Sequence, residues 1–255
     1  MASGFDQPGA WTDSLPFVRN VVRQELVARQ LADHLPSPSA SIDVVDVGCG
    51  QATQVIRLAR DGYSVVGIEP SAELLSQAYQ AVSVEEPSTV DRVTLVQGRL
   101  EDLTTLLPQK ADVIACHGVL MYLPDLQSAV AALAENLRSD GVLSLLTRNQ
   151  ASIAMRAGMQ GSWDQVQDAF DARHYDNRLG ITDVRADRPD EVLAACSSAD
   201  LEPITWYGVR LFSDHFDDTL PGADLEQLID AEEQAGRRDP YRHLAALTHV
   251  LARRG

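Results

Sequence analysis

The feature that most constrains the fold is the segment VVDVGCGQATQ at residues 44–54. Apolar residues and an aspartate lead into Gly48 and Gly50, and an amphipathic stretch follows. This order predicts a buried strand, a tight glycine loop and a helix, an arrangement that α/β proteins use to bind nucleotides. Dinucleotide-binding folds add a third glycine where this chain has Thr53. The loop therefore favours a nucleotide site that is not of the dinucleotide type.

Strand-like and helix-like segments alternate over residues 40–150, which predicts a doubly wound, mostly parallel α/β sheet. A helix stop is expected at Gly62 and an N-cap at Ser71. We expect strands at 42–48, 63–70, 92–98, within 111–123 and at 141–149, helices at 15–35, 51–62 and 71–84, and a helix with a turn at 126–141.

Beyond Arg148 the alternation stops. Residues 149–188 are polar and charged without a strand period, and such long inserts usually form substrate lids. Helices are then expected at 188–203 and 223–236, the second on the surface, and strands at 204–214 and 243–254. The chain is therefore expected to divide into an N-terminal helical cap (1–39), a nucleotide-binding α/β core (40–147), a lid insert after the fifth strand (148–188) and a C-terminal completion of the sheet (189–255).

Charge and cysteine content restrict the function classes. The net charge of −16 is unfavourable for nucleic-acid phosphates, although six arginines balance six aspartates within residues 148–188. No apolar run is long enough for a membrane span, and the first residues lack the features of a secretory signal. Cys49, Cys116 and Cys196 have neither disulfide-like nor zinc-like spacing. We therefore expect reduced thiols, no metal, no membrane and a cytoplasmic location.

Glu69 closes the second expected strand, about twenty residues after the glycine loop. An acid at this point can accept hydrogen bonds from both hydroxyls of a ribose. The alternative is that Glu69 only caps the following helix. The pairing of the loop with this acid favours a nucleoside ligand.

Five segments in this order resemble the motifs of class I S-adenosylmethionine (AdoMet)-dependent methyltransferases: VVDVGCGQATQ, GIEPSAELL, GRLEDL, DVIACHGVLMYL and LRSDGVLSLL. The resemblance covers residues 44–147 and implies a seven-stranded sheet with an antiparallel last strand, AdoMet lying across the carboxyl ends of the first strands. It places Asp46, Gly48, Cys49 and Gly50 near the methionine moiety, Glu69 at the ribose, and Leu100 and Glu101 beside the adenine. Arg99 stands where many members carry an aspartate, a departure at the adenine contact.

A narrower resemblance reaches both ends of the chain. The segments VRNVVRQELVARQL, CHGVLMYL, GVRLFSDH and DPYRHLAALTHVLARR are similar to the tRNA uridine-34 carboxyl methyltransferases, which esterify 5-carboxymethoxyuridine, and to their bacterial relatives. This implies that Arg19 and His117 contact AdoMet, and a guanidinium can clamp the methionine carboxylate. The alternatives are a solvated helix residue for Arg19 and a core histidine for His117.

The acceptor decides which catalytic groups are needed. A carboxylate is already ionised at neutral pH and needs cations or donors to aim it. For such an acceptor the candidate catalytic residues are Arg210 first and Arg148 second, although Arg210 could instead form an ordinary ion pair.

A hydroxyl or amine acceptor would require a general base, for which His117 and His215, then Tyr122 and Tyr175, are available. No N-P-P-[YF] motif follows the fourth strand, which disfavours amine methylation.

We therefore expect an AdoMet-dependent methyltransferase that modifies a carboxylate or other oxygen and releases S-adenosylhomocysteine. Its acceptor is either tRNA or a small acidic metabolite. A nicotinamide-linked oxidoreductase and a noncatalytic AdoMet-binding protein are the alternatives from other classes.

Overall fold

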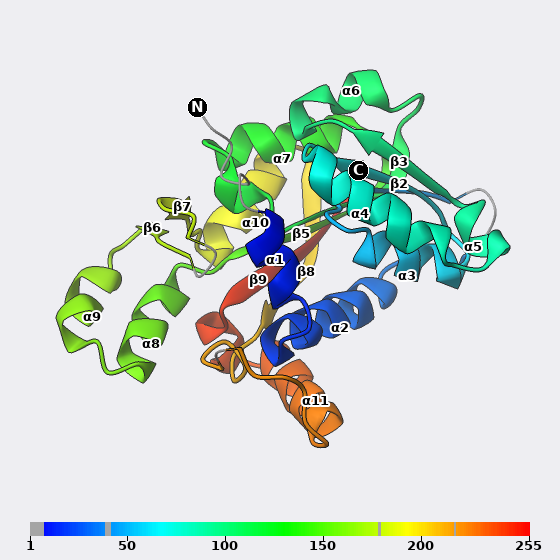
Figure 1. Ribbon diagram of the computed structural model, residues 1–255. Helices are drawn as coiled ribbons and strands as arrows, with labels where there is room; N and C mark the ends of the chain where they lie inside the picture. The colour runs from blue at the N-terminus through cyan, green and yellow to red at the C-terminus, as the bar shows by residue number, and fades with distance from the viewer. Residues whose placement is uncertain (1–7, 39–41, 178–179, 217) are drawn as a thin grey trace. The chain divides into compact units, whose positions relative to one another are not determined.

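The computed structural model describes residues 8–38, 42–177, 180–216 and 218–255, and Figure 1 shows its elements. Within these residues, seven strands form one sheet in the order β3-β2-β1-β4-β5-β9-β8. β1 is parallel to β2 and β4, and β2 is parallel to β3. The α/β class and the seven-stranded, mostly parallel sheet are confirmed. Residues 1–7 and Arg178, which the sequence analysis used, lie outside the described residues.

The chain separates into two compact units that are discontinuous in sequence. Unit 1 comprises residues 1–33, 146–193 and 205–250, and unit 2 comprises residues 34–145, 194–204 and 251–255. The elements β5, α10, β8 and β9 contribute residues to both units. The four-part division expected from the sequence stays a prediction.

Unit 2 contains the first strands and their helices. In chain order its elements are β1 (Asp43–Val47), α3 (Thr53–Asp61), β2 (Ser64–Glu69), α4 (Ala72–Ser83), α5 (Pro87–Val90), β3 (Val93–Gln97), a 3-10 turn η1 (Leu100–Asp102), α6 (Leu103–Leu106), β4 (Ala111–His117), η2 (Leu120–Tyr122), α7 (Leu126–Glu135) and the beginning of β5 (Leu137–Arg148). The last four residues of β1 are buried, as expected for a strand between two parallel neighbours.

Two predicted helix ends in unit 2 are confirmed by their backbone geometry. Gly62 ends α3 with a φ of 106°, a left-handed conformation that glycine adopts without steric cost. Ser71 is the N-cap of α4, and its hydroxyl accepts a hydrogen bond from the Leu74 N–H at 3.3 Å. These ends fix where each helix begins and stops relative to its strand.

The fifth strand, expected to begin at residue 141, begins earlier: α7 stops at Glu135, and β5 begins at Leu137, where a turn is expected. Arg138 donates to Asp112 at 2.7 Å and to Asp43 at 2.8 Å. These long-range ion pairs hold the charged segment extended, and local periodicity does not reveal them.

Unit 1 contains α1 (Pro8–Ser14), α2 (Val18–Ala32), α8 (Ala151–Met159), α9 (Trp163–Ala169), β6 (His174–Tyr175), β7 (Val184–Arg185), α11 (Leu225–Gly236) and η3 (Tyr241–Leu244). It shares α10 (Pro189–Ser198), β8 (Leu201–Val209) and β9 (Leu247–Arg254) with unit 2. Figure 1 shows α8 and α9 as a helical hairpin, and α11 packs against α2. Within the described residues of either unit, no helix is long and apolar enough to cross a membrane.

The irregular insert expected at 149–188 is a partial error, because this stretch contains α8, α9 and the antiparallel pair β6–β7. Gln150 anchors the hairpin by donating to the carbonyls of Phe170 at 2.8 Å and Ala172 at 3.1 Å. The helices of the hairpin are short, at nine and seven residues, so their periodicity is weak in sequence.

The strand expected over 204–214 is also misplaced, because β8 runs from Leu201 to Val209. Arg210 adopts a φ of 66° and ends the strand. The chain then wraps around Glu232, a buried carboxylate in α11. Glu232 accepts the backbone N–H groups of residues 211, 212 and 213 at 2.7, 3.0 and 2.7 Å and the Ser213 hydroxyl at 2.5 Å. α11 is therefore not merely a surface helix, since it holds the loop that follows Arg210.

Replacing Glu232 by alanine should destabilise the protein strongly, because three backbone N–H groups and one buried hydroxyl lose their acceptor. We expect Glu232→Ala to lower the free energy of unfolding by roughly 3–5 kcal/mol in urea titrations. Glu226→Ala on the same helix is the control, because Glu226 is 77% exposed and lies 3.4 Å from Arg29. Its expected cost is below about 1 kcal/mol. Equal effects of the two substitutions would contradict this role.

Candidate active site

The glycine loop of unit 2 follows β1 and requires left-handed backbone. Gly48 and Gly50 have φ values of 75° and 55°, and Ala52, the N-cap of α3, has 66°. A Cβ on Gly48 would lie 2.3 Å from Val119 Cγ2, so no side chain fits there. The N–H groups of Gly48 and Cys49 both donate to the Ile68 carbonyl, at 2.7 and 3.1 Å. The loop is thus held against β2 at the carboxyl ends of the strands.

Glu69 ends β2 and connects this loop to the start of α4. Its Oε2 accepts the Gly50 N–H at 2.9 Å, and its Oε1 accepts the Ser71 N–H at 2.9 Å. Burial raises the pKa of Glu69, and the two backbone donors oppose that rise. Each carboxylate oxygen has two lone pairs, so each retains one acceptor site. Glu69 therefore both organises the backbone and can accept ribose hydroxyls.

Asp46 and Cys49 line the same end of the sheet. Asp46 is buried in β1 and pairs with Gly67 of β2 and Ala115 of β4. Burial, together with the charges of Asp46 and Glu69, raises the pKa of the Cys49 thiol far above its ordinary value. A thiol with such a pKa is not a nucleophile at neutral pH.

Leu100 and Glu101 lie in η1, directly after β3, which pairs with β2 through Glu69 and Gln97. Leu100 is buried, whereas Glu101 is exposed. Asp102 accepts the backbone N–H of Arg99 at 3.0 Å and shapes this turn. The structure therefore brings the predicted adenine-flanking residues to the strand end next to Glu69.

His117 is the last residue of β4, and its Nε2 lies 2.8 Å from the Ser144 hydroxyl on β5. This contact fixes the imidazole plane at the carboxyl end of the strand. Sequence reasoning missed Ser144, because nothing near it in the chain indicates a histidine partner. All the predicted cofactor residues of unit 2 thus lie at, or a few residues from, the carboxyl ends of neighbouring strands.

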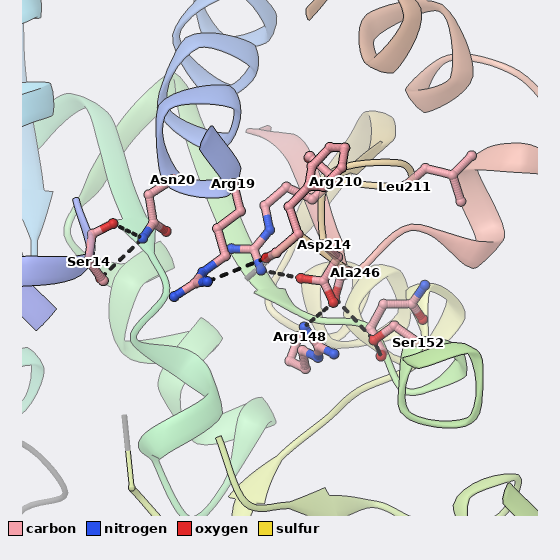
Figure 2. Close-up of polar contacts among 12 residues, drawn as sticks. Ser14, Arg19, Asn20, Arg148, Ser152, Arg210, Leu211, Asp214 and Ala246 are labelled. Atoms are coloured by element: carbon pink, nitrogen blue, oxygen red, sulfur yellow. Dashed lines mark hydrogen bonds and ion pairs between the residues drawn. The ribbon is translucent and has the colours of Figure 1, made fainter. Parts of the chain in front are cut away.

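Unit 1 holds the predicted arginines around one carboxylate (Figure 2). Asp214 forms ion pairs with Arg210 and, at 3.5 Å, with Arg148. The Arg148 side chain is only 4% exposed, and its guanidinium lies 4.9 Å from the Tyr175 ring centre. Among the described residues, Arg148 Nε and Nη2 and Arg210 Nε are buried without a hydrogen-bond partner. Two guanidinium groups therefore share one acid and keep unused donors.

Electrostatics explain how Asp214 stays ionised. Burial alone would raise its pKa, but the charges of Arg210, Arg148 and Arg156 hold the pKa well below the ordinary value. Burial raises the pKa of Tyr175 despite the nearby arginines, so this phenol stays protonated at neutral pH. Tyr175 is therefore unsuitable as the general base that the sequence left open.

Arg19 is also in unit 1, buried on α2. Its Nη1 lies 3.3 Å from Asp218 Oδ1 and 3.5 Å from the Phe216 carbonyl. It is therefore not a solvated helix residue. Both of these oxygen acceptors belong to the loop that follows β8, and the guanidinium also lies 5.6 Å from the centre of the Phe17 ring.

The other two candidate bases lie apart in the chain. His215 follows Asp214, and its ring centre lies 4.6 Å from that of Phe216. Tyr122 belongs to η2 in unit 2. Among the described residues, no three His, Cys, Asp or Glu side chains gather where they could hold a metal ion.

Comparison with known proteins identifies the chemistry. Residues 45–145 match the family described as "Methyltransferase domain". Over 238 residues, the chain is 28% identical to the tRNA 5-carboxymethoxyuridine methyltransferase of Escherichia coli (strain K12). The aligned region covers 93% of this chain and 88% of that protein. The chain is an S-adenosylmethionine-dependent methyltransferase.

One further curated protein and one solved structure are also similar to this chain. The ubiquinone biosynthesis O-methyltransferase of Klebsiella pneumoniae (strain 342) is 33% identical over 119 residues, 47% of this chain and 48% of that protein. The solved structure is the crystal structure of magnesium protoporphyrin IX methyltransferase from Synechocystis PCC 6803 with bound S-adenosylhomocysteine. It has a TM-score of 0.62 at 17% identity, and the superposition covers 100% of this chain and 95% of that chain. The second likeness concerns the fold alone.

The residues of unit 2 fit AdoMet as the methyl donor. The glycine loop adopts a left-handed backbone directly after β1, and Glu69 beside it retains acceptor sites for hydroxyls. The missing third glycine argues against the pyrophosphate of a dinucleotide. The nicotinamide-linked oxidoreductase considered from the sequence is therefore not supported.

Substituting Glu69 should weaken AdoMet binding, because the ribose acceptor and the loop anchor are lost together. We expect Glu69→Ala to raise the Kd of S-adenosylhomocysteine at least tenfold by calorimetry, whereas Glu73→Ala, at an exposed position of α4, leaves it unchanged. The 2′-deoxy analogue separates the two roles. Wild type should prefer the ribose form and Glu69→Ala should not, and unchanged discrimination would refute ribose recognition.

The Asp214 cluster should produce a defined pH dependence of stability. A depressed folded-state pKa contributes stability that is present above the unfolded pKa and is lost as pH falls toward the folded value. We expect Asp214→Asn to cost roughly 3 kcal/mol at pH 7, because two buried arginines lose their partner. The difference in free energy of unfolding between wild type and Asp214→Asn should be constant above about pH 5 and should narrow below about pH 4.

Urea unfolding between pH 3 and pH 8 measures this difference. Asp230→Asn is the matched control, since Asp230 is 65% exposed and lies 3.5 Å from Arg29. If the difference in free energy of unfolding between wild type and Asp214→Asn is the same at pH 8 and pH 3, the cluster does not depress the Asp214 pKa.

Proposed function

We propose that this methyltransferase esterifies a carboxylate, and that its acceptor is 5-carboxymethoxyuridine at position 34 of tRNA. The similarity to the Escherichia coli protein extends well beyond the methyltransferase domain and covers 93% of the chain. It therefore includes the segments that carry Arg19, Arg148 and Arg210, which lie outside residues 45–145.

The observation that carries the proposal is the excess of buried guanidinium groups in unit 1. Arg148 and Arg210 have one shared acid, Asp214, and keep buried donors without partners. A carboxylate that enters this cluster gains charge-assisted hydrogen bonds in a site with little solvent. The arginines would thus bind the acceptor and fix the direction of its reactive oxygen.

Transfer to a carboxylate needs no general base, because the acceptor is ionised at neutral pH. Bound AdoMet supplies the methyl group of its sulfonium. The S–CH3 bond breaks while an O–CH3 bond forms, and a methyl ester and S-adenosylhomocysteine result without net proton transfer. The role of the chain is to orient and to exclude water, which suits buried arginines better than a histidine base.

The remaining assignments complete this proposal. Glu69 accepts the ribose hydroxyls, and Leu100 and Glu101 flank the adenine. Asp46, Gly48, Cys49 and Gly50 surround the methionine part. Arg19 binds the methionine carboxylate, and His117, held by Ser144, contacts AdoMet at the end of β4.

A small acidic metabolite is the second candidate acceptor, and the charge distribution favours it. The net charge of the chain is −16. Two arginines of the arginine-rich segment 148–188 are already paired with acids. Arg173 donates to Glu191 at 2.8 and 2.5 Å, and Arg185 donates to Asp187 at 2.8 Å. These pairs reduce the basic surface that an RNA backbone would need.

The two acceptors are separated by following a labelled methyl group from AdoMet. We expect label in tRNA that contains 5-carboxymethoxyuridine and none in tRNA that lacks it. Mild alkali should release the label as methanol, because methyl esters hydrolyse whereas base-linked methyl groups do not. Label only in a small-molecule extract would select the second candidate.

Arg210→Gln supplies the matched test of the arginine cluster. We expect it to lower methyl transfer at least tenfold while the Kd for AdoMet changes less than about twofold, because this side chain orients the acceptor. Alkali-stable label, or normal transfer by Arg210→Gln, would contradict carboxyl methylation through this cluster.

A further inference from the structure

Gly67 lies inside β2, two residues before Glu69, and is buried. It pairs with Asp46 of β1 on one side and with Leu95 of β3 on the other, so its backbone is that of an ordinary strand residue. A glycine inside a strand weakens the sheet, and it often marks a place that another part of the chain approaches closely. What lies against Gly67 therefore explains this glycine.

Three side chains gather where a Cβ of residue 67 would stand. That Cβ would lie 2.9 Å from Cys49 Sγ, 2.9 Å from Leu95 Cδ2 and 3.1 Å from Val55 Cγ2. Cys49 belongs to the glycine loop after β1, and Val55 belongs to α3, which packs against β2. One added methyl group would overlap atoms of this packed region, and such overpacking is destabilising. The absence of a side chain at Gly67 thus makes room for the loop.

The neighbours of Gly67 differ in how easily they can move. Leu95 Cδ2 is the far end of a flexible side chain, so a change of rotamer can displace it. Cys49 Sγ is one bond from its Cβ and is packed in buried surroundings. The backbone of Cys49 is held as well, because its N–H donates to the Ile68 carbonyl at 3.1 Å and its carbonyl accepts the Ala52 N–H at 2.9 Å. A side chain at residue 67 would therefore displace the loop.

The thiol of Cys49 lies on the core side of the loop. Cys49 is 8% exposed, and burial raises the pKa of its thiol far above the ordinary value. The neighbouring Val55 and Leu95 are also buried, so Sγ lies among apolar atoms. The Cys49 side chain is therefore placed to hold the loop by packing.

We infer that Gly67 is a positioning residue for the methyl donor, because the space at its Cα receives Cys49 Sγ and fixes how closely residues 48–50 approach β2. This approach brings the Gly50 N–H to Glu69 Oε2, at 2.9 Å. The inference rests on the assignment of the glycine loop and Glu69 to AdoMet proposed above. It does not depend on the identity of the acceptor.

A double-mutant cycle tests this role. We expect Gly67→Ala to raise the Kd of S-adenosylhomocysteine at least tenfold, by calorimetry on the full-length protein. In a Cys49→Ala background, where Sγ is absent, the same substitution should raise the Kd less than about threefold. A loss of affinity of equal size in both backgrounds would overturn the inference.

Leu95→Val is the matched control background, because it removes the other atom at 2.9 Å and leaves the loop unchanged. Gly67→Ala should still raise the Kd at least tenfold there. Urea unfolding of the same variants measures their stability. If Leu95→Val relieves the loss of affinity as fully as Cys49→Ala does, or if that loss follows the loss of unfolding free energy across the set, Gly67 serves the core alone and the inference fails.

A second variant covers the case in which Gly67→Ala does not fold. Cys49→Val keeps Gly67 but places a second γ atom in the space beside it, and we expect the Kd of S-adenosylhomocysteine to rise at least fivefold. Cys196→Val is the control, since Cys196 is a buried cysteine of α10 outside this loop, and it should leave the Kd unchanged. An unchanged Kd in Cys49→Val would contradict the role of this space.

These outcomes are separable from the proposed function. Binding of S-adenosylhomocysteine is measured without an acceptor, so a failure to methylate a carboxylate leaves the role of Gly67 intact. If Glu69→Ala binds S-adenosylhomocysteine as tightly as wild type, the assignment of the loop to AdoMet fails together with this inference. If Glu69→Ala binds weakly and the cycle shows no coupling between residues 49 and 67, this inference alone fails.

Discussion

The hydrogen bonds of Glu69 are the interaction on which the cofactor half of this protein depends. One carboxylate accepts the Gly50 N–H and the Ser71 N–H, each at 2.9 Å. It thereby joins the loop after β1 to the segment that starts α4. A buried carboxylate is costly unless it is hydrogen-bonded, and its raised pKa reflects that cost. The donors that offset this cost also fix the left-handed loop that follows β1.

Buried acids organise unit 1 in a similar way. Glu232 gathers three consecutive backbone N–H groups after Arg210, and Asp214 holds Arg210 and Arg148 together. Removal of either acid leaves buried donors or charges without a partner, which costs more than the loss of a surface ion pair. These two acids are therefore distinct from the many exposed ones that give the chain its net charge of −16. They position cations and backbone, whereas the exposed acids mainly set the surface potential.

The acceptor question depends on this contrast between the site and the surface. Locally, Arg148 and Arg210 share Asp214 and keep buried donors without partners among the described residues. Elsewhere, Arg173 and Arg185 are neutralised by Glu191 and Asp187. A compact acid needs only the local excess, whereas an RNA backbone needs an extended basic surface. Recognition of tRNA by this protein would thus rely on one base and its carboxylate more than on phosphate contacts.

The sequence by itself determined the alternating α/β core, the glycine loop, the N-cap at Ser71 and the position of Glu69. These follow from local patterns, since strand burial, left-handed glycines and helix caps are set by residues close in the chain. Tertiary structure decided the end of β8 at Val209, the beginning of β5 at Leu137 and the convergence of Arg148 and Arg210 on Asp214. Each of these depends on ion pairs or hydrogen bonds to distant residues, such as Glu232 and Asp112. No local periodicity encodes such partners, so only the folded chain reveals them.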